Sequence, residues 1–463
     1  MAYDDAVGKR VLLDCMEKYA EYIYKVFVVD KSAEFTSPGH EEIELALVRM
    51  YRHTGKKLYL ELAAHFINAR GTDPSIAEEE LHYTQAHLPV RKQNEAVGHA
   101  VRAVYLYTGM AYVAAETGEQ ELCDACRTLW NDIVKNKMYV TGGIGSTRIG
   151  EAFTRAFDLP NDTAYTETCA AIGLVFFANA MLALENKAEY ADVAERALYN
   201  GVLSGLSLDG KAFFYTNPLE INLSERLSVK RGSRPFPITQ RPAVFSCSCC
   251  PPNINRLLPA LGNYVYGKDG ETLFVNQFVG STLNSGGVRC EQTTAYPNDG
   301  KIVLKAEGVA RVAVRIPSWC KGFVLNKAYV MENGYAVVEN DGTPIELCLD
   351  VSPRLTYADS RIIRASCRVC VMRGPVVYCA EGVDNGEHMH SLAVPQAPDI
   401  SESFDKELGL YTLDVSCVRR KAFDGGLYSN EPPAEETATL HLIPYNCFAN
   451  RGETDMLVWF NRK

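Results

Sequence analysis

The stretch ALGNYVYGKDGETLFVNQF, residues 260–278, contains the point where the character of the chain changes. Before it, apolar residues recur every three or four positions, as in a helix with one buried face. After Gly262, short runs rich in β-branched and aromatic residues alternate with glycine, proline, asparagine and aspartate, as strands alternate with turns. The sequence therefore predicts a helical first part and an all-β second part.

The helical pattern is clearest at residues 11–28, where apolar side chains stand at positions 12, 13, 16, 19, 20, 23, 26 and 27. This spacing recurs in segments separated by short turns such as Thr54-Gly55, which suggests repeated helical hairpins. Further helices are predicted at residues 42–51, 58–70, 94–108, 110–116, 120–135, 168–185 and 187–206.

Strand-like segments bounded by turn residues follow in the second part. The clearest are residues 272–278, 301–306, 309–316, 335–338 and 345–349, and the same texture continues from residue 362 to residue 458. We therefore expect three domains, which are a helical domain at residues 1–264, a β-sandwich at residues 265–375 and a second β-sandwich at residues 376–463.

The composition is that of a globular protein, with 463 residues of which 47% are apolar and 22% charged. A net charge of −10 argues against a nucleic-acid partner, which would need a basic face. The longest apolar stretch, residues 170–184, is too short to span a bilayer, and the first residues lack the apolar core of a signal peptide. We therefore expect a cytoplasmic protein with no membrane partner, whose fifteen cysteines are reduced thiols.

Residues 141–169, TGGIGSTRIGEAFTRAFDLPNDTAYTETC, contain too much glycine, proline and aspartate for a helix and predict a long loop. Loops of this length in compact proteins are commonly functional. The glycines do not form a phosphate-binding loop, since no Gly-Lys-Ser/Thr follows them.

The end of this loop and a later cysteine cluster together offer a set of metal ligands. Glu167 and Cys169 lie two residues apart, and Cys249 and Cys250 are adjacent. Zinc binds cysteine sulfur and carboxylate oxygen and favours four ligands. Glu167 and Cys169 can meet at one metal only if an extended segment leads into the following helix. The alternative is a set of buried free thiols, with Glu167 stabilising that helix through the helix dipole.

Three further side chains have a chemical and a structural interpretation. Glu151 lies in the same loop, and a carboxylic acid there, beside a thiolate, would supply the second half of a double displacement. Taken alone it is an ordinary glutamate. His40 and His99 each follow a glycine at or near the start of a helical segment. Each could orient a substrate hydroxyl group, or each could be a capping or core histidine.

Five segments in order along the chain resemble glycoside hydrolase family 127, the β-L-arabinofuranosidases and their close relatives. They are TGGIGSTRIGEAF (141–153), LPNDTAYTETCA (159–170), FFYTNPLE (213–220), CSCCPPNINR (247–256) and RGPVVYCAEGVDN (373–385). The similarity extends from about Gly8 to the C-terminal ANRGETDMLVWF.

The resemblance implies an (α/α)6 helical barrel followed by β-sandwich domains, a bound Zn²⁺ and a retaining mechanism. Carried onto matching positions, it implies that Cys249 is both the nucleophile and a zinc ligand, and that Glu151 is the general acid and then the base. The remaining zinc ligands would be Glu167, Cys169 and Cys250. The implied substrate is an arabinose-containing oligosaccharide or glycoconjugate, from which β-L-arabinofuranose or a related furanose is released through a cysteine thioglycosyl intermediate. The sugar contacts would be His40, His99, Glu195, Tyr215 and Cys247.

The chain departs from the family in one respect, because family members carry further barrel helices before the point where this sequence begins. We therefore expect an N-terminally incomplete barrel, completed by a homodimer or by a partner chain. An alternative function is a truncated, non-catalytic zinc-stabilised scaffold or one half of a split glycosidase. A third alternative is a sugar epimerase or an unsaturated glucuronyl hydrolase, since these share the architecture. Neither needs the Glu-Cys and Cys-Cys set, so the motifs argue against that alternative.

Overall fold

The structure is a computed structural model that describes residues 1–223, 236–244 and 247–463. It divides into two units. The first comprises residues 1–138, 144–156 and 173–186, and the second comprises residues 139–143, 157–172 and 187–463. The first unit is helical, and the second contains all the sheets of the described chain. Within the described ranges, no helix is both long and apolar enough to cross a membrane.

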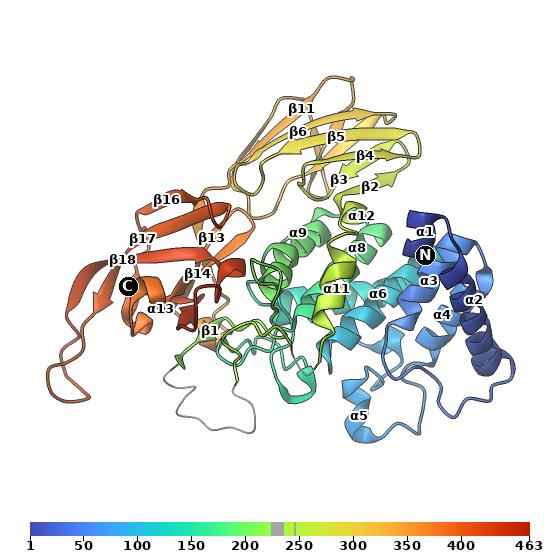
Figure 1. The fold of residues 1–463 in the computed structure, drawn as a ribbon, viewed down its shortest axis with the longest axis horizontal. Helices are drawn as coiled ribbons and strands as arrows, with labels where there is room; N and C mark the ends of the chain where they lie inside the picture. The colour runs from blue at the N-terminus through green and yellow to red at the C-terminus, as the bar shows by residue number, and fades with distance from the viewer. Residues whose placement is uncertain (224–235, 245–246) are drawn as a thin grey trace. The chain divides into compact units, whose positions relative to one another are not determined.

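The first unit consists of helices joined by turns and by longer loops (Figure 1). The pair predicted on either side of Thr54-Gly55 is present, and Gly55 ends its helix in the left-handed conformation that glycine tolerates. π-helical turns, η1 (Lys25–Val29) and η3 (Ile133–Lys137), extend two of the helices. The helices are α1 (Ala2–Val7), α2 (Val11–Tyr24), α3 (Ile43–Thr54), α4 (Lys57–Ala69), α5 (Glu78–Tyr83), α6 (Ala100–Thr117), α7 (Gln120–Asp132) and most of α8 (Thr168–Leu184).

The prediction of two helices at residues 94–108 and 110–116 was wrong, because α6 is one continuous helix over Ala100–Thr117. Its interior glycine lies against α3, where an added Cβ on Gly109 would come within 2.8 Å of the Glu44 side chain. The glycine therefore serves close helix packing and does not break the helix. Residues 94–99 are not helical, since Gly98 has a positive φ and His99 pairs with Ala152 in an isolated bridge.

The core of the first unit lies where α6, α7 and α8 meet. Aromatic rings hold these helices together, with Tyr107 and Trp130 both packing on Phe177 at centroid distances of 5.7 and 5.4 Å. Gly173 of α8 lies directly on α6, where a Cβ would come within 2.4 Å of Val104. The evenly apolar sequence of α8 predicted a buried helix, and this prediction is confirmed.

Helix α2 presents apolar side chains on more than one face. It buries Leu13 and Ala20 while packing on α4. Leu12, Met16 and Tyr19 stand 57%, 48% and 58% exposed. The sequence period predicted one buried face, and the structure leaves a second apolar face open among the described residues.

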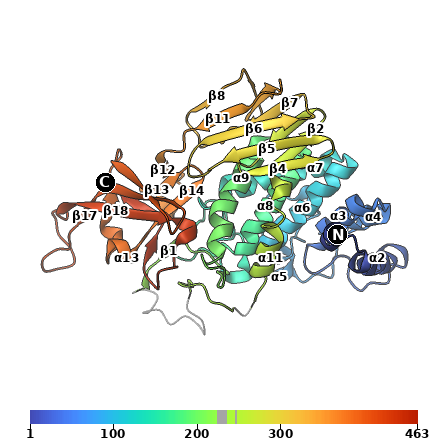
Figure 2. The same cartoon turned by 45° about the horizontal axis from the view of Figure 1, so that its top comes forward.

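From residue 187 onward, the second unit first contains the helical segments α9 (Ala188–Arg196), η5 (Ala197–Val202), η6 (Leu203–Gly205), α11 (Cys250–Leu257) and α12 (Gly262–Val265). Two five-stranded sheets follow and share one apolar core, so they form a β-sandwich (Figure 2). One sheet contains, in order, β2 (Tyr266–Asp269), β3 (Thr272–Val275), β7 (Arg311–Arg315), β10 (Tyr335–Glu339) and β9 (Val330–Glu332). The other contains β4 (Ser281–Ser285), β5 (Val288–Thr294), β6 (Lys301–Glu307), β11 (Ile345–Leu349) and β8 (Phe323–Leu325).

A third, ten-stranded sheet has buried apolar residues on both faces. Its strands follow the order β1-β19-β14-β18-β17-β15-β20-β13-β12, with β16 paired to β17. Their bounds are β1 (Glu220–Ile221), β12 (Pro353–Tyr357), β13 (Arg368–Arg373), β14 (Val376–Glu381), β15 (Leu392–Val394), β16 (Ile400–Asp405), β17 (Leu410–Arg420), β18 (Glu435–Pro444), β19 (Met456–Leu457) and β20 (Phe460–Arg462).

The fold class predicted from the sequence, a helical region followed by β-sandwich layers, is confirmed. The expected boundary between residues 375 and 376 falls inside the ten-stranded sheet, where β13 and β14 pair through Arg373 and Val376. Because backbone pairing across a boundary joins the two sides into one sheet, we propose that the two β regions divide between Leu349 and Pro353 instead.

Candidate metal centre and active site

Four residues of the second unit bring their ligand atoms together. One ligand atom from each of Glu167, Cys169, Cys249 and Cys250 lies within 4.8 Å of all the others. The sulfur of Cys250 lies 3.7 Å from the sulfurs of both Cys169 and Cys249, and the Cys249 sulfur lies 3.4 Å from Glu167 Oε1. The residues that the sequence offered as metal ligands therefore form one compact cluster.

The backbone on either side of the cluster explains how residues so close in sequence share a centre. Glu167 pairs with Thr216 in an isolated antiparallel bridge, and α8 begins at the next residue, Thr168. An extended residue thus leads directly into a helix, as the spacing of Glu167 and Cys169 required. Cys249 and Cys250 stand at the start of α11, where two prolines occupy the first turn.

The thiols of the cluster titrate as a group. Hydrogen bonds from the thiols of Cys249 and Cys250 lower the pKa of Cys169 to about 6. The hydrogen bonds that Cys249 and Cys250 make to the Cys169 sulfur raise the pKa values of these two thiols, because they favour the protonated donors, and the charge of the Cys169 thiolate adds to the rise. The cluster therefore holds one thiolate readily, and a cation at its centre would be needed to stabilise several.

The spacing of the four ligand atoms fits zinc. With Zn–S bonds of about 2.3 Å, a tetrahedral site spaces two sulfurs about 3.8 Å apart and a sulfur and a carboxylate oxygen about 3.5 Å apart. The corresponding distances here are 3.7 Å and 3.4 Å. Sulfur ligands favour zinc over magnesium or calcium, which prefer oxygen. The cluster is therefore a candidate metal site whose dimensions and chemistry suit Zn²⁺.

A second group of expected residues lies in the first unit, around Glu151. His99 Nε2 lies 3.2 Å from Glu151 Oε2. The other ring nitrogen, Nδ1, accepts from the backbone N–H of Arg102, 3.4 Å away, as the cap of α6. In a neutral imidazole the proton therefore resides on Nε2 and points to the carboxylate. His40 lies nearby, with its ring centroid 6.5 Å from that of His99.

Glu151 stands in a strained turn, η4 (Ile149–Glu151). Its φ of 52° lies in the left-handed region, which costs a residue with a side chain about 1 kcal/mol or more. The base of the turn is tied by hydrogen bonds between Thr147 and Ala152, and Phe153 N donates to Gly98 O. The surrounding backbone thus holds Glu151 in a conformation that it would not adopt alone.

Two other expected site residues accompany the thiol cluster, and a third does not. The Cys247 thiol lies within hydrogen-bonding reach of both the Tyr215 side chain and the Cys249 thiol. Glu195 is only 1% exposed and accepts hydrogen bonds from Arg315, Tyr296 and Trp319. It belongs to a buried ion-pair network that holds α9 against the first β-sandwich, and the structure does not bring it to the cluster.

Asn253 is a residue of the site that the sequence reasoning missed. It is 6% exposed, and its side chain forms a hydrogen bond with Cys169. Its Oδ1 accepts from Arg256 Nε at 2.7 Å, so the amide NH₂ group is the one that donates to the sulfur. A signal was present, because Asn253 follows Cys249 by one turn on the helix that begins at the cluster.

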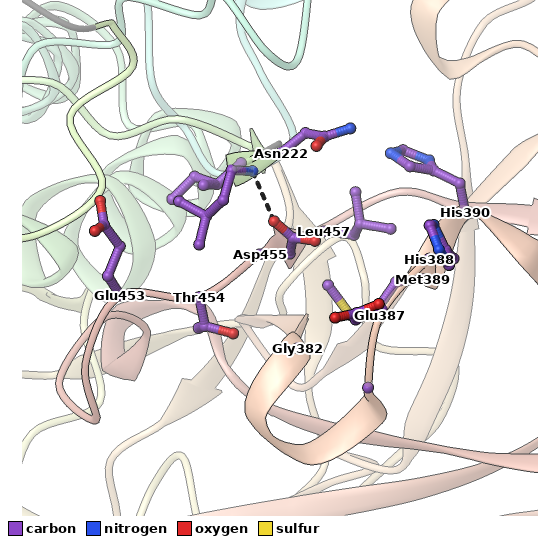
Figure 3. Close-up of a pocket in the computed structure, with 13 residues that line it drawn as sticks. Asn222, Gly382, Glu387, His388, Met389, His390, Glu453, Thr454, Asp455 and Leu457 are labelled. Atoms are coloured by element: carbon purple, nitrogen blue, oxygen red, sulfur yellow. Dashed lines mark hydrogen bonds between the residues drawn. The ribbon is translucent and has the colours of Figure 1, made fainter. Parts of the chain in front are cut away.

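A cavity of about 470 Å³ lies elsewhere in the second unit (Figure 3). Its lining includes Asn222, His388, His390 and Asp455, and Asp455 accepts a hydrogen bond from a backbone N–H beside it. None of the expected site residues lines this cavity. It is therefore separate from the thiol cluster.

Comparisons with known proteins cover the whole chain. Residues 1–263 match the family model of the β-L-arabinofuranosidase GH127 catalytic domain, residues 272–346 the GH127 middle domain, and residues 353–461 the glycoside hydrolase family 127 C-terminal domain.

A non-reducing end β-L-arabinofuranosidase of Bifidobacterium longum is 38% identical, with 100% of this chain and 77% of that protein covered. The crystal structure of a GH127 β-L-arabinofuranosidase from Geobacillus stearothermophilus T6 is 40% identical, with a TM-score of 0.92 over 100% of this chain and 78% of that one. A second solved GH127 β-arabinofuranosidase is 35% identical, with a TM-score of 0.87 over 100% and 75% of the two chains.

Proposed function

This chain belongs to glycoside hydrolase family 127 and is a glycoside hydrolase, and from that premise we propose that it releases β-L-arabinofuranose from the ends of oligosaccharides or glycoconjugates. The proposal includes dependence on Zn²⁺ and a thioglycosyl intermediate on Cys249. The observation that carries it is the compact set of Glu167, Cys169, Cys249 and Cys250, whose dimensions fit zinc.

Zn²⁺ held by Glu167, Cys169, Cys249 and Cys250 would keep the thiols deprotonated at neutral pH. The Cys249 sulfur attacks the anomeric carbon while Glu151 gives its proton to the leaving oxygen, so that a carbon–sulfur bond replaces a carbon–oxygen bond. Glu151 then takes a proton from water, whose oxygen displaces the sulfur and returns Cys249 to the thiolate. Two displacements at one carbon retain the anomeric configuration.

The first unit supplies the acid of this scheme. The proton on His99 Nε2 points to Glu151 Oε2, which holds the carboxyl group in one orientation. We place His40, Tyr215 and Cys247 around the sugar, where they would bind its hydroxyl groups. Glu195 is left out of this arrangement, because its oxygens already accept hydrogen bonds from Arg315, Tyr296 and Trp319.

The test combines metal content, activity and stereochemistry. The purified protein should contain one zinc per chain and hydrolyse an aryl β-L-arabinofuranoside with retention, followed by NMR of the first-formed sugar. Cys249→Ser and Glu151→Gln should each lower kcat by about a thousandfold or more, since each removes a group that acts in both steps. Cys348→Ser, at an exposed cysteine of β11, is the matched control and should leave kcat unchanged. Inversion of configuration would refute the proposed mechanism.

A second candidate function is one half of a split glycosidase, and the open apolar face of α2 favours it. We propose that a helical partner polypeptide covers Leu12, Met16 and Tyr19, since these side chains recur at helical spacing and remain exposed. Zinc without hydrolysis, followed by activity on adding the partner, would support this function.

The mass of the purified chain, measured by light scattering, shows whether a different polypeptide or a second copy of this chain covers the exposed face of α2. A monomer that binds the partner supports the split enzyme, and a dimer that Met16→Lys dissociates would assign the face to a second copy instead. Arg49→Lys, at an exposed position of α3, is the control and should leave the mass unchanged.

We also propose a cytoplasmic, reducing location, because all fifteen cysteines are free in the structure. A count of reactive thiols in the denatured protein purified without reductant tests this. Fifteen thiols are expected, and a lower count that reductant restores would contradict it.

A further inference from the structure

The turn that carries Glu151 also carries an apolar side chain that faces solvent. Ile149 is 84% exposed, whereas the side chain of Glu151, two residues later, is 31% exposed. Single exposed apolar residues are common and mean little by themselves. Here the exposed residue stands in a turn whose conformation the surrounding chain imposes, next to the group that we propose as the acid.

The back of this turn is closed by an aromatic side chain. A Cβ at Gly150 would lie 3.5 Å from the Tyr83 ring, which packs edge-to-face on His99 at 5.5 Å between centroids. The guanidinium of Arg102 covers the same ring at 4.9 Å. The turn therefore has one face packed on Tyr83, and Ile149 lies on the open part.

The position of Ile149 is fixed with that of Glu151. Its N–H donates to Thr147 Oγ1 at 3.1 Å, and Thr147 in turn pairs with Ala152 across the base of the turn. Ile149 cannot move far without moving Glu151, because the same short segment of backbone carries both. Ile149 is therefore an exposed apolar side chain held two residues from the proposed acid in the same fixed turn.

We propose that Ile149 contacts the leaving group of the substrate, an inference that rests on the proposed role of Glu151 as the acid. The acid of a retaining glycosidase lies beside the leaving oxygen, so the side chains next to it on the solvent side meet whatever that oxygen carries. An isoleucine there offers no hydrogen bond and suits a ring with an apolar face. Such a ring is the C–H face of a second sugar or an aryl group.

Substrates that differ only in the leaving group test this inference. We would compare the methyl glycoside, the 4-nitrophenyl glycoside and a disaccharide of β-L-arabinofuranose, using Ile149→Ser. The matched control is Ile363→Ser, since Ile363 is 75% exposed and also lies in a short turn, η7 (Ile363–Ala365). Ile149→Ser should lower kcat/KM about fivefold for the two ring-bearing substrates and leave the methyl glycoside within about twofold.

The second step of the reaction, in which the glycosyl-enzyme reacts with water or an alcohol, shows whether Ile149→Ser merely distorts the active site. Hydrolysis of the glycosyl-enzyme does not involve the departed group, so the partition between water and a small acceptor such as methanol should stay unchanged in Ile149→Ser. Transfer to benzyl alcohol, which must occupy the leaving-group position, should fall with the same factor as kcat/KM. The pH dependence of kcat/KM should also remain that of the wild type.

The pattern of kcat/KM losses over the three substrates shows whether Ile149 contacts the leaving group and which kind of leaving group it contacts. Losses on both ring-bearing substrates support the contact with a ring face, and a loss on the aryl glycoside alone assigns the contact to aryl leaving groups. An equal loss on the methyl glycoside, or no loss on any substrate, would overturn the inference while leaving the proposed function intact. Failure of the wild type to hydrolyse any of the three would instead remove the proposed function.

Discussion

The amide of Asn253 shows how one side chain outside the ligand set acts on the thiol cluster. Arg256 binds the amide oxygen at 2.7 Å, which directs the NH₂ group to Cys169. The thiols of Cys249 and Cys250 lower the pKa of Cys169 most, and the amide adds to their effect. Partners of this kind orient metal ligands and stabilise their charged forms.

Asn253→Asp should weaken zinc binding, because it places a carboxylate where an N–H donor met the sulfur. We expect the zinc dissociation constant to rise by about 10- to 100-fold, measured by competition with a chromophoric chelator. Asn255→Asp is the control, since Asn255 is exposed on the same helix and should leave zinc affinity nearly unchanged. Equal effects of the two substitutions would mean that added charge, and not the lost hydrogen bond, weakens binding.

Glu41 is a fully buried carboxyl group in the first unit. Burial raises its pKa from 4.5 to about 7, and Arg70, whose Nη1 lies 3.2 Å from Glu41 Oε1, limits the rise. Between these pH values the folded protein keeps a proton that the unfolded chain has lost. The contribution of Glu41 to stability is therefore complete below pH 4.5 and decreases as the pH rises to about 7.

Glu41→Gln should remove this pH dependence, since an amide does not titrate in this range. The free energy of unfolding of the wild type, minus that of Glu41→Gln, should fall by about 3 kcal/mol between pH 4.5 and 7, as followed by denaturant unfolding. Glu42→Gln, at a partly exposed neighbour, should show no such trend. A difference that stays constant with pH would contradict the raised pKa.

Helix α8 depends on glycine where it meets α6. A Cβ at Gly173 would come within 2.4 Å of the Val104 side chain and 3.0 Å of the Tyr105 ring. Because protein interiors are close-packed, these neighbours cannot move apart freely. The same argument explains why Gly109 interrupts the predicted pattern of α6 without ending the helix.

Gly173→Ala should therefore destabilise the protein although alanine is the better helix former. We expect the free energy of unfolding to fall by about 1–3 kcal/mol, which should appear as a lower midpoint in thermal unfolding monitored by circular dichroism. Gly262→Ala, at the first residue of α12 with nothing within 4 Å of its added Cβ, is the control and should be neutral or slightly stabilising. A stability unchanged by Gly173→Ala would mean that α6 and α8 pack less closely than described.

The thiol cluster joins segments of the second unit that are distant in sequence, so zinc binding should stabilise that unit as a whole. A ligand that binds only the folded state raises the free energy of unfolding by about 4 kcal/mol when its concentration is a thousandfold above its dissociation constant. EDTA should lower the midpoint of thermal unfolding, and zinc, but not magnesium, should restore it. If the midpoint is unaffected by EDTA while zinc is removed, the cluster has no part in stability.

The pattern of neighbouring residues in the sequence determined several features of the fold and of the candidate site. The change from helices to strands near residue 262, the buried character of α8 and the residue types of the candidate metal site were all predictable, because each depends on the period or chemistry of neighbouring residues. The boundaries that failed, as in α6, depend on what a glycine packs against. The proposed shift of the domain boundary away from residue 375 depends instead on the backbone pairing of β13 and β14, which periodicity does not reveal.

Only the tertiary structure decided which distant residues share a site. Glu195 was expected at the sugar, but Arg315, 120 residues later in the chain, draws it into a buried ion pair. Asn253 was not expected at the site, but it lies one helical turn after Cys249 in α11, and there its side chain meets Cys169 from a distant segment. Periodicity describes one segment at a time, whereas the position of a side chain in a site depends on how segments far apart in sequence pack.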